Sequence, residues 1–336
     1  MTSVLIVVLN WNGIDDTEKC VASLRNLSYS NYEIVIVDNG SVDDSLQRLK
    51  RLAQKEPKIT LLTNPENLGF AGGVNTGIRY GIKEKFDAIA LFNNDAVVDK
   101  EWLTFLVAGL DKKDVAIVTG KLLHADGKTI DSTGDFYTTW GIPSPRYRGQ
   151  KAENAPESDY IFGASGGASI YRTSLFKEIG LFDETFFAYY EDVDISFRAQ
   201  LAAHKIYYQE KAVAYHEQGA TSSKIPGFTV YQTFKNLPLL FWKDVPTKLL
   251  PPVGVRFALL YVLIFGNAIK NGAGWPAFKG VLASIGYFWT SALWKRLVIQ
   301  RNKKVSAEYI NSVLYHDIPP EQTGMRAFRK FFTGKS

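Results

Sequence analysis

The sequence predicts an α/β protein with a mostly parallel central sheet, helices on both faces, and a C-terminal helical extension that is basic and apolar. Two observations support this fold class. Apolar runs alternate with amphipathic stretches along the first hundred residues, which is typical of a parallel sheet covered on both faces. Residues 241–336 instead combine long apolar runs with many cations.

The first hundred residues predict four strands with a helix between each pair. The apolar runs predict the strands Val4–Leu9, Glu33–Val37, Ile59–Leu62 and Ala88–Phe92. Apolar residues at helical spacing predict the helices Asp15–Leu27, Asp43–Lys55 and Ala71–Lys85. Asp15 and Asp16 suit a helix N-terminus.

The pattern loosens after Trp102. We expect a strand at Val115–Thr119, long loops over 124–160, a glycine-interrupted strand at Tyr160–Arg172, a helix at Glu191–Ala203, and short strands at Ile206–Tyr208 and Ala212–Tyr215.

Composition narrows the class of protein. A chain of 336 residues suggests about two domains. The 46% hydrophobic and 22% charged residues fit a cored protein and exclude disordered and fibrous classes. The single cysteine, Cys20, excludes an intrachain disulfide and a cysteine-based zinc site, and we expect it to be buried on a helix. The run Val4–Leu9 is too short for a signal-peptide core, so we expect a cytoplasmic protein.

Four polar loops follow the four predicted strands. They read Asn10-Trp11-Asn12-Gly13, Asp38-Asn39-Gly40-Ser41, Thr63 to Gly69, and Asn93-Asn94-Asp95. Turn chemistry alone explains one such loop. Four loops at the carboxyl ends of parallel strands indicate a binding site, because ligands bind there. The Gly-x-Gly-x-x-Gly and Walker motifs are absent from the first loop system, so neither a dinucleotide site nor a P-loop is predicted.

Three of these segments offer chemistry for a nucleotide. Asp38 can accept hydrogen bonds from a base or a ribose. Gly72 and Gly73 open a helix whose free amides favour phosphate. Asp95 suits Mg²⁺ or Mn²⁺, which prefer oxygen ligands, although an ordinary turn accounts equally well for this segment.

Two later segments add ionisable groups. Glu191, Asp192 and Asp194 begin an amphipathic helix after an aromatic run. The helix dipole alone can explain carboxylates there, but a carboxylate beside aromatic side chains can also have a raised pKa and act as a general base. His216 follows a strand that could lie next to Asp95, although a lone histidine is more often structural.

In their order, these motifs resemble the family 2 glycosyltransferases with the GT-A fold, and among them the bacterial rhamnosyltransferase-like branch. The resemblance covers about residues 1–222 and rests on the segments 7–13, 37–41, 67–77, 93–95, 180–184 and 191–194, with Arg198 and His216. Residues 223–336 match no specific motif of that family.

The resemblance implies a domain organisation and a donor site. Residues 1–240 would form a GT-A type nucleotide-diphosphate-sugar-binding domain, with 1–100 as the nucleotide-binding half and 101–240 as the acceptor-binding half. Residues 241–336 would associate with membrane or oligomerise. The implied donor-binding residues are Asn10, Asp38, Asn67, Gly72, Gly73, Asn93, Gly167 and Glu191.

It also implies a mechanism. Asp192 would be the catalytic base, and Asp95 and His216 would bind Mg²⁺ or Mn²⁺. Asn93 replaces the first carboxylate of the family's Asp-x-Asp motif, which leaves one carboxylate there. The implied reaction is inverting transfer of a sugar, with dTDP-rhamnose as the first candidate donor, to a glycan or polyprenyl-linked acceptor in bacterial cell-surface polysaccharide synthesis.

Two alternative functions remain at this point. A nucleotidyltransferase would need basic residues around a triphosphate and two metal-binding carboxylates, and the first hundred residues offer neither. A non-catalytic sugar-nucleotide-binding protein would not need Asp38, Asp95, Asp192 and His216 together.

The C-terminal region predicts an anionic surface as partner. Residues 241–336 hold 14 Lys and Arg against 4 Asp and Glu, a net charge of +10. The apolar runs Phe257–Gly266 and Gly280–Trp294 are shorter than the roughly 20 residues of a spanning helix. Tryptophans beside cations indicate contact with the inner face of the cell membrane. The alternative is packing on the catalytic core or on a second subunit of a homo-oligomer. Nucleic acid is not predicted, because its binders interleave charge more evenly.

Overall fold

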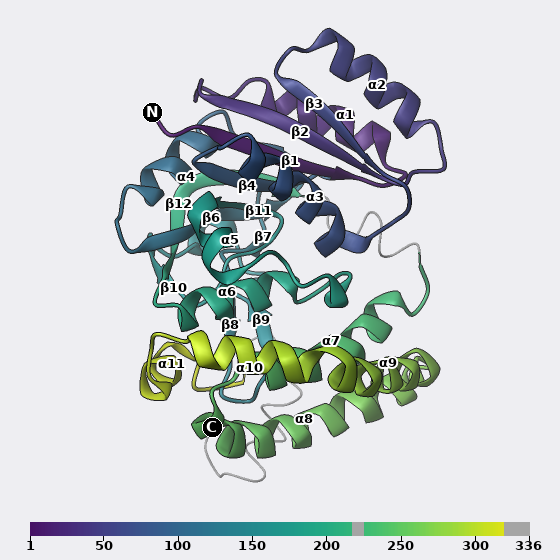
Figure 1. The fold of residues 1–336 in the computed structure, drawn as a ribbon, viewed down its shortest axis with the longest axis vertical. Coiled ribbons are helices and arrows are strands. Elements are labelled where there is room, and N and C mark those ends of the chain that lie inside the picture. The colour runs from purple at the N-terminus through teal and green to yellow at the C-terminus, as the bar shows by residue number, and fades with distance from the viewer. Residues whose placement is uncertain (217–224, 319–336) are drawn as a thin grey trace.

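The computed structural model describes residues 1–216 and 225–318 and confirms the predicted fold class. The described residues form a ten-stranded mixed sheet in the order β10-β12-β6-β11-β4-β1-β2-β3, with β5 joined to β12 and β7 joined to β6 (Figure 1). The end of the predicted basic extension, residues 319–336, lies outside the described residues.

The N-terminal half is a parallel sheet with crossover helices. Its strands are β1 (Val4–Asn10), β2 (Tyr32–Asn39), β3 (Ile59–Asn64) and β4 (Ala88–Asn93). The helices between them are α1 (Ile14–Leu24), α2 (Ser45–Lys55) and α3 (Gly69–Lys83). All seven predicted elements are confirmed, with ends that differ by at most three residues.

The second half of the sheet is mixed because β11 (Ala168–Arg172) lies antiparallel to both of its neighbours, β4 and β6 (Val115–His124). The other main elements are β5 (Ala96–Val98), α4 (Trp102–Leu110), α5 (Thr173–Ile179), α6 (Glu191–Leu201) and β12 (Lys205–His216). The two predicted short strands are one strand, β12, with an irregularity between Gln209 and Val213.

The prediction of long loops over 124–160 was incomplete. This segment contains the short strands β7 (Ile130–Ser132), β8 (Asp135–Tyr137) and β9 (Pro143–Pro145), and β10 (Asp159–Ile161) begins at its end. Strands of three residues leave no readable alternation in a sequence.

The core has one layer on each face of the sheet, because successive side chains of a strand point to opposite faces. Val4, Ile6 and Val8 of β1 pack in one cluster that includes residues of α1 and α4. Leu5 and Val7 pack in the other cluster, which includes residues of α3 and α6.

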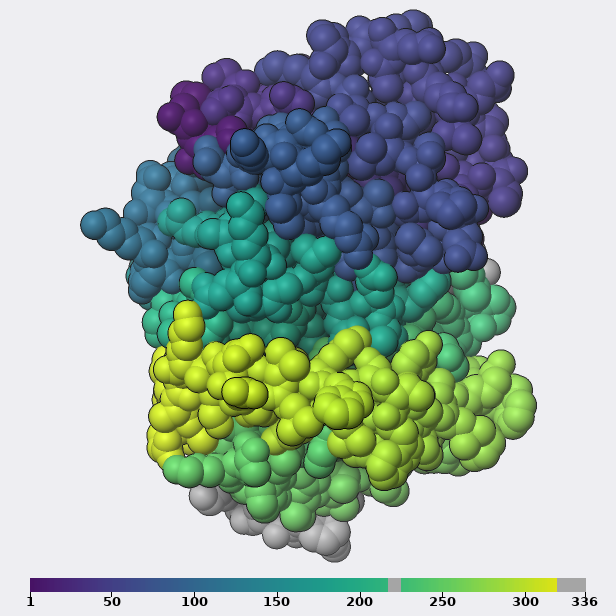
Figure 2. Space-filling model, viewed as in Figure 1, coloured from purple at the N-terminus to yellow at the C-terminus, as the bar shows by residue number. Residues whose placement is uncertain are grey.

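Between residues 225 and 318, five α-helices form the C-terminal layer. They are α7 (Phe228–Asp244), α8 (Leu250–Lys270), α9 (Gly274–Tyr287), α10 (Leu293–Asn302) and α11 (Ala307–Val313). The predicted domain boundary at residue 240 falls inside α7. Leu240 and Ile310 share a buried cluster with Phe162 and Phe197, so the layer packs directly on the sheet domain (Figure 2).

Buried charges also join this layer to the sheet domain. Lys243 of α7 is 2% exposed and forms ion pairs with Asp183 and with Asp194 of α6. Asp194 also pairs with Arg198 at 2.8 Å, and Lys295 of α10 pairs with Asp183 at 2.5 Å. The network therefore connects α6, α7, α10 and the loop before α6.

The outer faces of α8 to α10 are apolar and exposed. Their exposed apolar side chains include Val255, Leu259, Val262, Ile269, Trp275, Phe278, Leu282, Ile285, Trp289, Trp294, Leu297 and Val298. The expectation that neither apolar run is long enough to span a membrane was wrong for the first run. The helical segment Thr247–Lys270 has 24 residues, and an 18-residue window within it has a mean hydropathy of 1.9 and is 17% buried. By length and composition it could cross a bilayer.

Candidate functional site

The sheet register brings the four predicted loops to one edge, with the loop after β3 beside Asn39, which pairs with Asn64. Asn10 at the end of β1 pairs with Asp38 at the end of β2, and Leu9 pairs with Asn93 at the end of β4. Because β1 lies between β2 and β4, the loops that follow these strands share one border of the sheet.

Asp38 is fixed by a small hydrogen-bond network. Asn10 Nδ2 donates to Asp38 Oδ1 at 2.8 Å, and the Ser41 hydroxyl donates to the same oxygen at 2.7 Å. Within the part of the chain that the structure describes, Asp38 Oδ2 accepts a longer contact of 3.3 Å from the Ser41 amide and no shorter one. Thr17 donates to Asn10 Oδ1 at 2.8 Å, and the side chains of Asn10 and Asp38 are both buried. Asn10 therefore orients Asp38, and direct contact of Asn10 with a donor stays a prediction.

The start of α3 is also occupied by protein groups. Asn67 Oδ1 accepts from the Gly69 amide at 2.9 Å and from Asn39 Nδ2 at 3.0 Å. The Ala71 amide donates to the Phe187 carbonyl at 3.1 Å. The Gly69 and Ala71 amides thus have protein partners, and contact of this helix start with a donor phosphate stays a prediction.

Glycine serves close packing at the two predicted phosphate-binding positions. A Cβ on Gly73 would lie 2.4 Å from Leu9 Cδ1, and a Cβ on Gly72 would lie 2.6 Å from Leu68 Cβ. Gly73 thus lets α3 approach β1, and Gly72 lets the helix start fold against its own preceding loop.

Asp95 and His216 lie side by side, as predicted. The antiparallel pairing of β5 with β12 places His216 opposite Ala96, the residue after Asp95. His216 Nε2 lies 3.0 Å from Asp95 Oδ1 and 3.3 Å from Asn93 Nδ2. His216 Nδ1 lies 2.8 Å from Asp131 Oδ2, a buried carboxylate on β7.

These contacts shift two pKa values. Burial alone would lower the pKa of His216, but its hydrogen bonds with Asp131 and Asp95 raise it to about 9. Burial opposes ionisation of Asp131, and the hydrogen bond from His216 with the charge of Arg148 nevertheless lowers its pKa.

The donor set fits a divalent cation that is shared with a substrate. Asp131 on Nδ1 leaves His216 Nε2 directed at Asp95, which is the carboxylate–histidine arrangement found behind metal-bound imidazoles. Across residues 1–216 and 225–318, no three His, Cys, Asp or Glu side chains form a group that could hold a metal. Two protein ligands suit Mg²⁺ or Mn²⁺, because such ions complete their shell with water and substrate phosphates.

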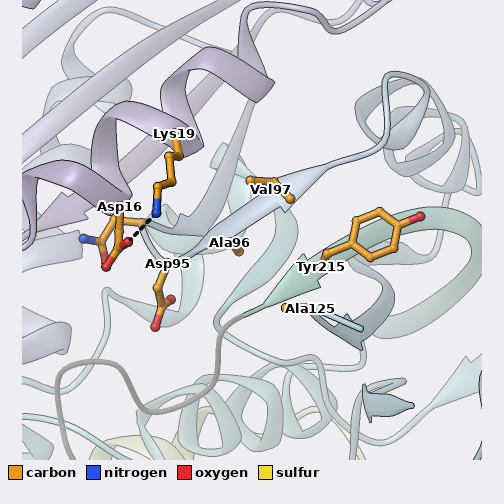
Figure 3. Close-up of a pocket in the computed structure, with 8 residues that line it drawn as sticks. Asp16, Lys19, Asp95, Ala96, Val97, Ala125 and Tyr215 are labelled. Carbon is orange, nitrogen blue, oxygen red and sulfur yellow. Dashed lines mark ion pairs between the residues drawn. The ribbon is translucent and has the colours of Figure 1, made fainter. Parts of the chain in front are cut away.

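A small pocket adjoins Asp95 (Figure 3). On α1, Lys19 pairs with Asp16 at one side of this pocket, and Tyr215 of β12 lies at the other. Its volume is about 180 Å³. Ligand pockets commonly measure about 300–1,000 Å³, so this pocket can hold only part of a nucleotide sugar.

Asp192 lies at the same border of the sheet, next to the loop that contains Gly166 and Gly167. Asp192 Oδ2 accepts from the Gly166 amide at 2.9 Å. The next residue, Gly167, accepts from the Asn93 amide at 2.9 Å, and a Cβ on Gly167 would lie 2.9 Å from Asn93 Nδ2. Through Gly166 and Gly167, the proposed base is thus adjacent to the Asn93, Asp95 and His216 cluster.

The two neighbouring carboxylates differ in environment. Burial raises the pKa of Asp192, while the Gly166 and Val193 amides partly oppose that shift. Glu191 is 6% exposed, and among the described residues its Oε2 has no hydrogen-bond partner. Burial with the charge of Asp192 raises its pKa well above the usual value. Glu191 is therefore enclosed by protein, and its contact with a donor stays a prediction.

Sequence reasoning missed three side chains at the site. Asp131 orients His216, Ser41 orients Asp38, and Asp135 is a buried carboxyl whose pKa is raised well above its usual value by burial and by the charge of Asp192. Asp131 and Asp135 lie on strands of three residues inside the segment predicted as loops. Only Ser41 had a signal, because it directly follows a polar strand end.

Named proteins are similar to this chain over most of its length. The low-salt glycan biosynthesis hexosyltransferase Agl10 of Haloferax volcanii is 24% identical, over 78% of this chain and 81% of that protein. The N-acetylglucosaminyl-diphospho-decaprenol L-rhamnosyltransferase of Mycobacterium tuberculosis is 27% identical, over 67% of this chain and 80% of that protein.

Solved structures share the fold. The mannosyltransferase PcManGT of Pyrobaculum calidifontis, in complex with GDP-Man and Mn²⁺, has a TM-score of 0.54 and 14% identity, over 99% of this chain and 88% of that chain. GalNAc-T7 with UDP, GalNAc and Mn²⁺ has a TM-score of 0.56 and 17% identity, over 71% of this chain and 47% of that chain.

The family is assigned by the N-terminal part of the chain. The sequence profile described as glycosyl transferase family 2 matches residues 3–180, which include Asn10, Asp38 and Asp95. Asp192 and His216 lie beyond the matched residues, so their roles rest on geometry. Because the match spans more than half of the 336 residues, the chain belongs to glycosyl transferase family 2 and is a glycosyltransferase.

Proposed function

We propose that this protein is an inverting glycosyltransferase that moves a sugar from a nucleotide-diphosphate donor to a hydroxyl of a glycan or polyprenyl-linked glycan. One observation carries the proposal: Asp192 reaches the Asp95 and His216 cluster through Gly166, Gly167 and Asn93. A base and a diphosphate-binding cluster at one sheet border are what a single displacement requires.

Three side chains have assigned roles toward the donor. Asp38 Oδ2, which has a 3.3 Å contact with the Ser41 amide, would accept hydrogen bonds from the nucleoside. Asp95 and His216 would hold Mg²⁺ or Mn²⁺. When bound, the cation supplies positive charge that stabilises the leaving diphosphate.

Asp192 acts on the acceptor. Its carboxylate takes the proton of the acceptor hydroxyl, and the acceptor oxygen bonds to the anomeric carbon. The bond from that carbon to the diphosphate breaks on the opposite face, so a nucleoside diphosphate leaves and the configuration inverts. The raised pKa of Asp192 makes it a stronger base than an ordinary aspartate.

We place the enzyme at the cytoplasmic face of the membrane. The exposed apolar faces of α8 to α10 carry the exposed cations Arg256, Lys270, Lys279, Arg301 and Lys303 among or beside them. Apolar side chains with tryptophans and cations suit the headgroup region of an anionic bilayer. The rhamnosyltransferase relative is named for a decaprenol-linked substrate, and such an acceptor would present its sugar at that surface. Assembly into a homo-oligomer through the same faces is the competing proposal.

A screen of nucleotide sugars tests the donor. We expect dTDP-rhamnose with Mg²⁺ or Mn²⁺ to raise the melting temperature and to be hydrolysed slowly, and we expect transfer products to have inverted anomeric configuration by NMR. Stabilisation by a different nucleotide sugar would replace this donor, and retained configuration would refute the single displacement.

A further inference from the structure

The segment that leads into α6 has an unfavourable backbone. Phe187, Tyr189 and Tyr190 have φ values of 62°, 69° and 73°, in the left-handed region that side chains other than glycine rarely adopt. Tyr190 directly precedes Glu191 and Asp192. The conformation of this segment, residues 185–190, therefore sets where α6 begins and where the Asp192 carboxylate lies.

Two adjacent side chains of α7 bind the carbonyl groups of this segment. Asn236 Nδ2 lies 3.0, 2.9 and 2.8 Å from the carbonyl oxygens of Phe186, Ala188 and Tyr189, so its two N–H groups are shared among these three acceptors. Lys235 Nζ donates to the carbonyls of Thr185 and Phe186 at 3.0 and 3.1 Å. Two side chains thus bind four carbonyl groups of this segment, those of Thr185, Phe186, Ala188 and Tyr189.

The burial of these two side chains shows that they are not a solvated helix face. Asn236 is fully buried and Lys235 is 3% exposed. Burial lowers the pKa of Lys235 to about 8, against the opposing charges of Glu191 and Asp183. Within the described residues Lys235 has no ion pair, so its polar contacts are these backbone carbonyls.

The same segment also reaches the donor half of the fold. The Phe187 carbonyl accepts from the Ala71 amide of α3 at 3.1 Å, and a Cβ on Gly69 would lie 2.4 Å from that carbonyl oxygen. On its other side, α7 is fixed by α9, because a Cβ on Gly280 would lie 2.4 Å from the Tyr231 carbonyl oxygen. The segment is therefore held between the C-terminal layer and the start of α3.

We propose that Lys235 and Asn236 are positioning residues for the base: through the carbonyls of residues 185–190 they fix the start of α6 and hold the Asp192 carboxylate at the Gly166 amide. This inference rests on the proposed role of Asp192. It makes the C-terminal helical layer part of the catalytic apparatus, since α7 belongs to that layer.

Variants of α7 test the proposal in the full chain. Lys235→Met keeps the length of the side chain and removes its donors, and Asn236→Leu does the same for the amide. Because misplacing a catalytic group by about 1 Å costs roughly 100-fold, we expect kcat to fall by roughly 100-fold with the donor Kd and KM unchanged. Lys235→Arg retains donors and should recover most of the rate. Lys248→Met, at an exposed lysine, is the matched control.

A merely structural role gives a different result. The proposal would be overturned if the variants had lower melting temperatures than the unaltered protein but the same kcat. The kcat values would be compared at a temperature where the variants and the unaltered protein are folded. If Lys235→Met does not fold, two other measurements decide the same question: Asn236→Leu compared with the control, and the rate of Lys235→Arg. A folded Asn236→Leu protein with normal kcat overturns the proposal.

A double variant separates this proposal from the proposed function. In an Asp192→Asn background, Lys235→Met should cause no further loss of transfer, because the positioned group is already absent. Losses that multiply would overturn the positioning role alone. An Asp192→Asn protein with the normal rate would instead overturn the base assignment.

Discussion

Replacing Lys243 by methionine should destabilise the whole protein, because its ammonium group joins the C-terminal layer to the sheet domain. Lys243 is 2% exposed and contacts Asp183 and Asp194, the latter at 2.5 Å. Despite burial, which opposes ionisation, the charges of Lys243 and its neighbours lower the pKa of both carboxyls. Methionine has a similar length, so the change removes charge with little loss of packing.

The expected cost is about 3–5 kcal/mol of unfolding free energy, the range for removing one partner of a buried ion pair. Lys295 still pairs with Asp183 and Arg198 still pairs with Asp194, so the lower end of this range applies. Typical domains have about 5–15 kcal/mol in total, so the variant should remain folded at pH 7 but unfold at clearly lower urea concentration.

The cost should also depend on pH. Carboxyls with a lowered folded pKa stabilise the native state above their unfolded pKa of about 4, and this stability is lost as pH falls. Removing Lys243 raises their folded pKa, so the difference between the proteins should be fully present above about pH 4 and should narrow as the pH falls below that value. Urea unfolding at pH 7 and at about pH 3 measures it. The exposed control Lys248→Met should change little. Equal midpoints for Lys243→Met and the unaltered protein at pH 7 would refute the reasoning.

Three further predictions concern the site and the apolar faces. Asp95→Ala should weaken donor binding, since Asp95 lies 3.0 Å from His216 in the expected metal site. Calorimetry should then give the same donor affinity with Mg²⁺ or Mn²⁺ as with EDTA, and an unchanged metal response would exclude Asp95 as a ligand. The rate of transfer should fall as pH drops through the raised pKa of Asp192, because only the ionised carboxylate accepts a proton. A pH profile in which the rate does not fall above the ordinary aspartate pKa of about 3.9 contradicts this. The full chain should float with anionic vesicles at low salt and float less at high salt, and the double variant Leu282→Ser with Ile285→Ser, at exposed positions of α9, should float less than the unaltered protein. A protein that stays in the soluble fraction as a defined dimer or higher oligomer would favour assembly through these faces.

Much of the sheet and part of the site could be predicted because the signals are local. Apolar runs of about four to six residues, such as Val4–Leu9, mark buried strands, and polar residues at their ends mark the ligand border. The neighbours His216 and Asp95 followed from one assumption, that their strands pair. These features need only strand order and register.

Other features depend on contacts that a sequence does not display. Gly73 permits the close packing of α3 on Leu9, a contact that the loop sequence does not reveal. Lys235 and Asn236 resemble a solvated helix face until α7 is placed against residues 185–190. The apolar run Phe257–Gly266 covers only part of α8, because the helix continues beyond the apolar residues on both sides, from Leu250 to Lys270.

The most direct test of the account is the transfer rate of Asp192→Asn beside that of Glu191→Gln, with donor binding measured for both. Asp192 accepts from Gly166 at the site border, whereas Glu191 is enclosed by protein and burial raises its pKa. The account predicts that Asp192→Asn binds donor normally and loses about 100- to 10,000-fold in rate, while Glu191→Gln keeps most of its activity. Normal transfer by Asp192→Asn together with loss in Glu191→Gln would contradict the central claim and move the base to Glu191.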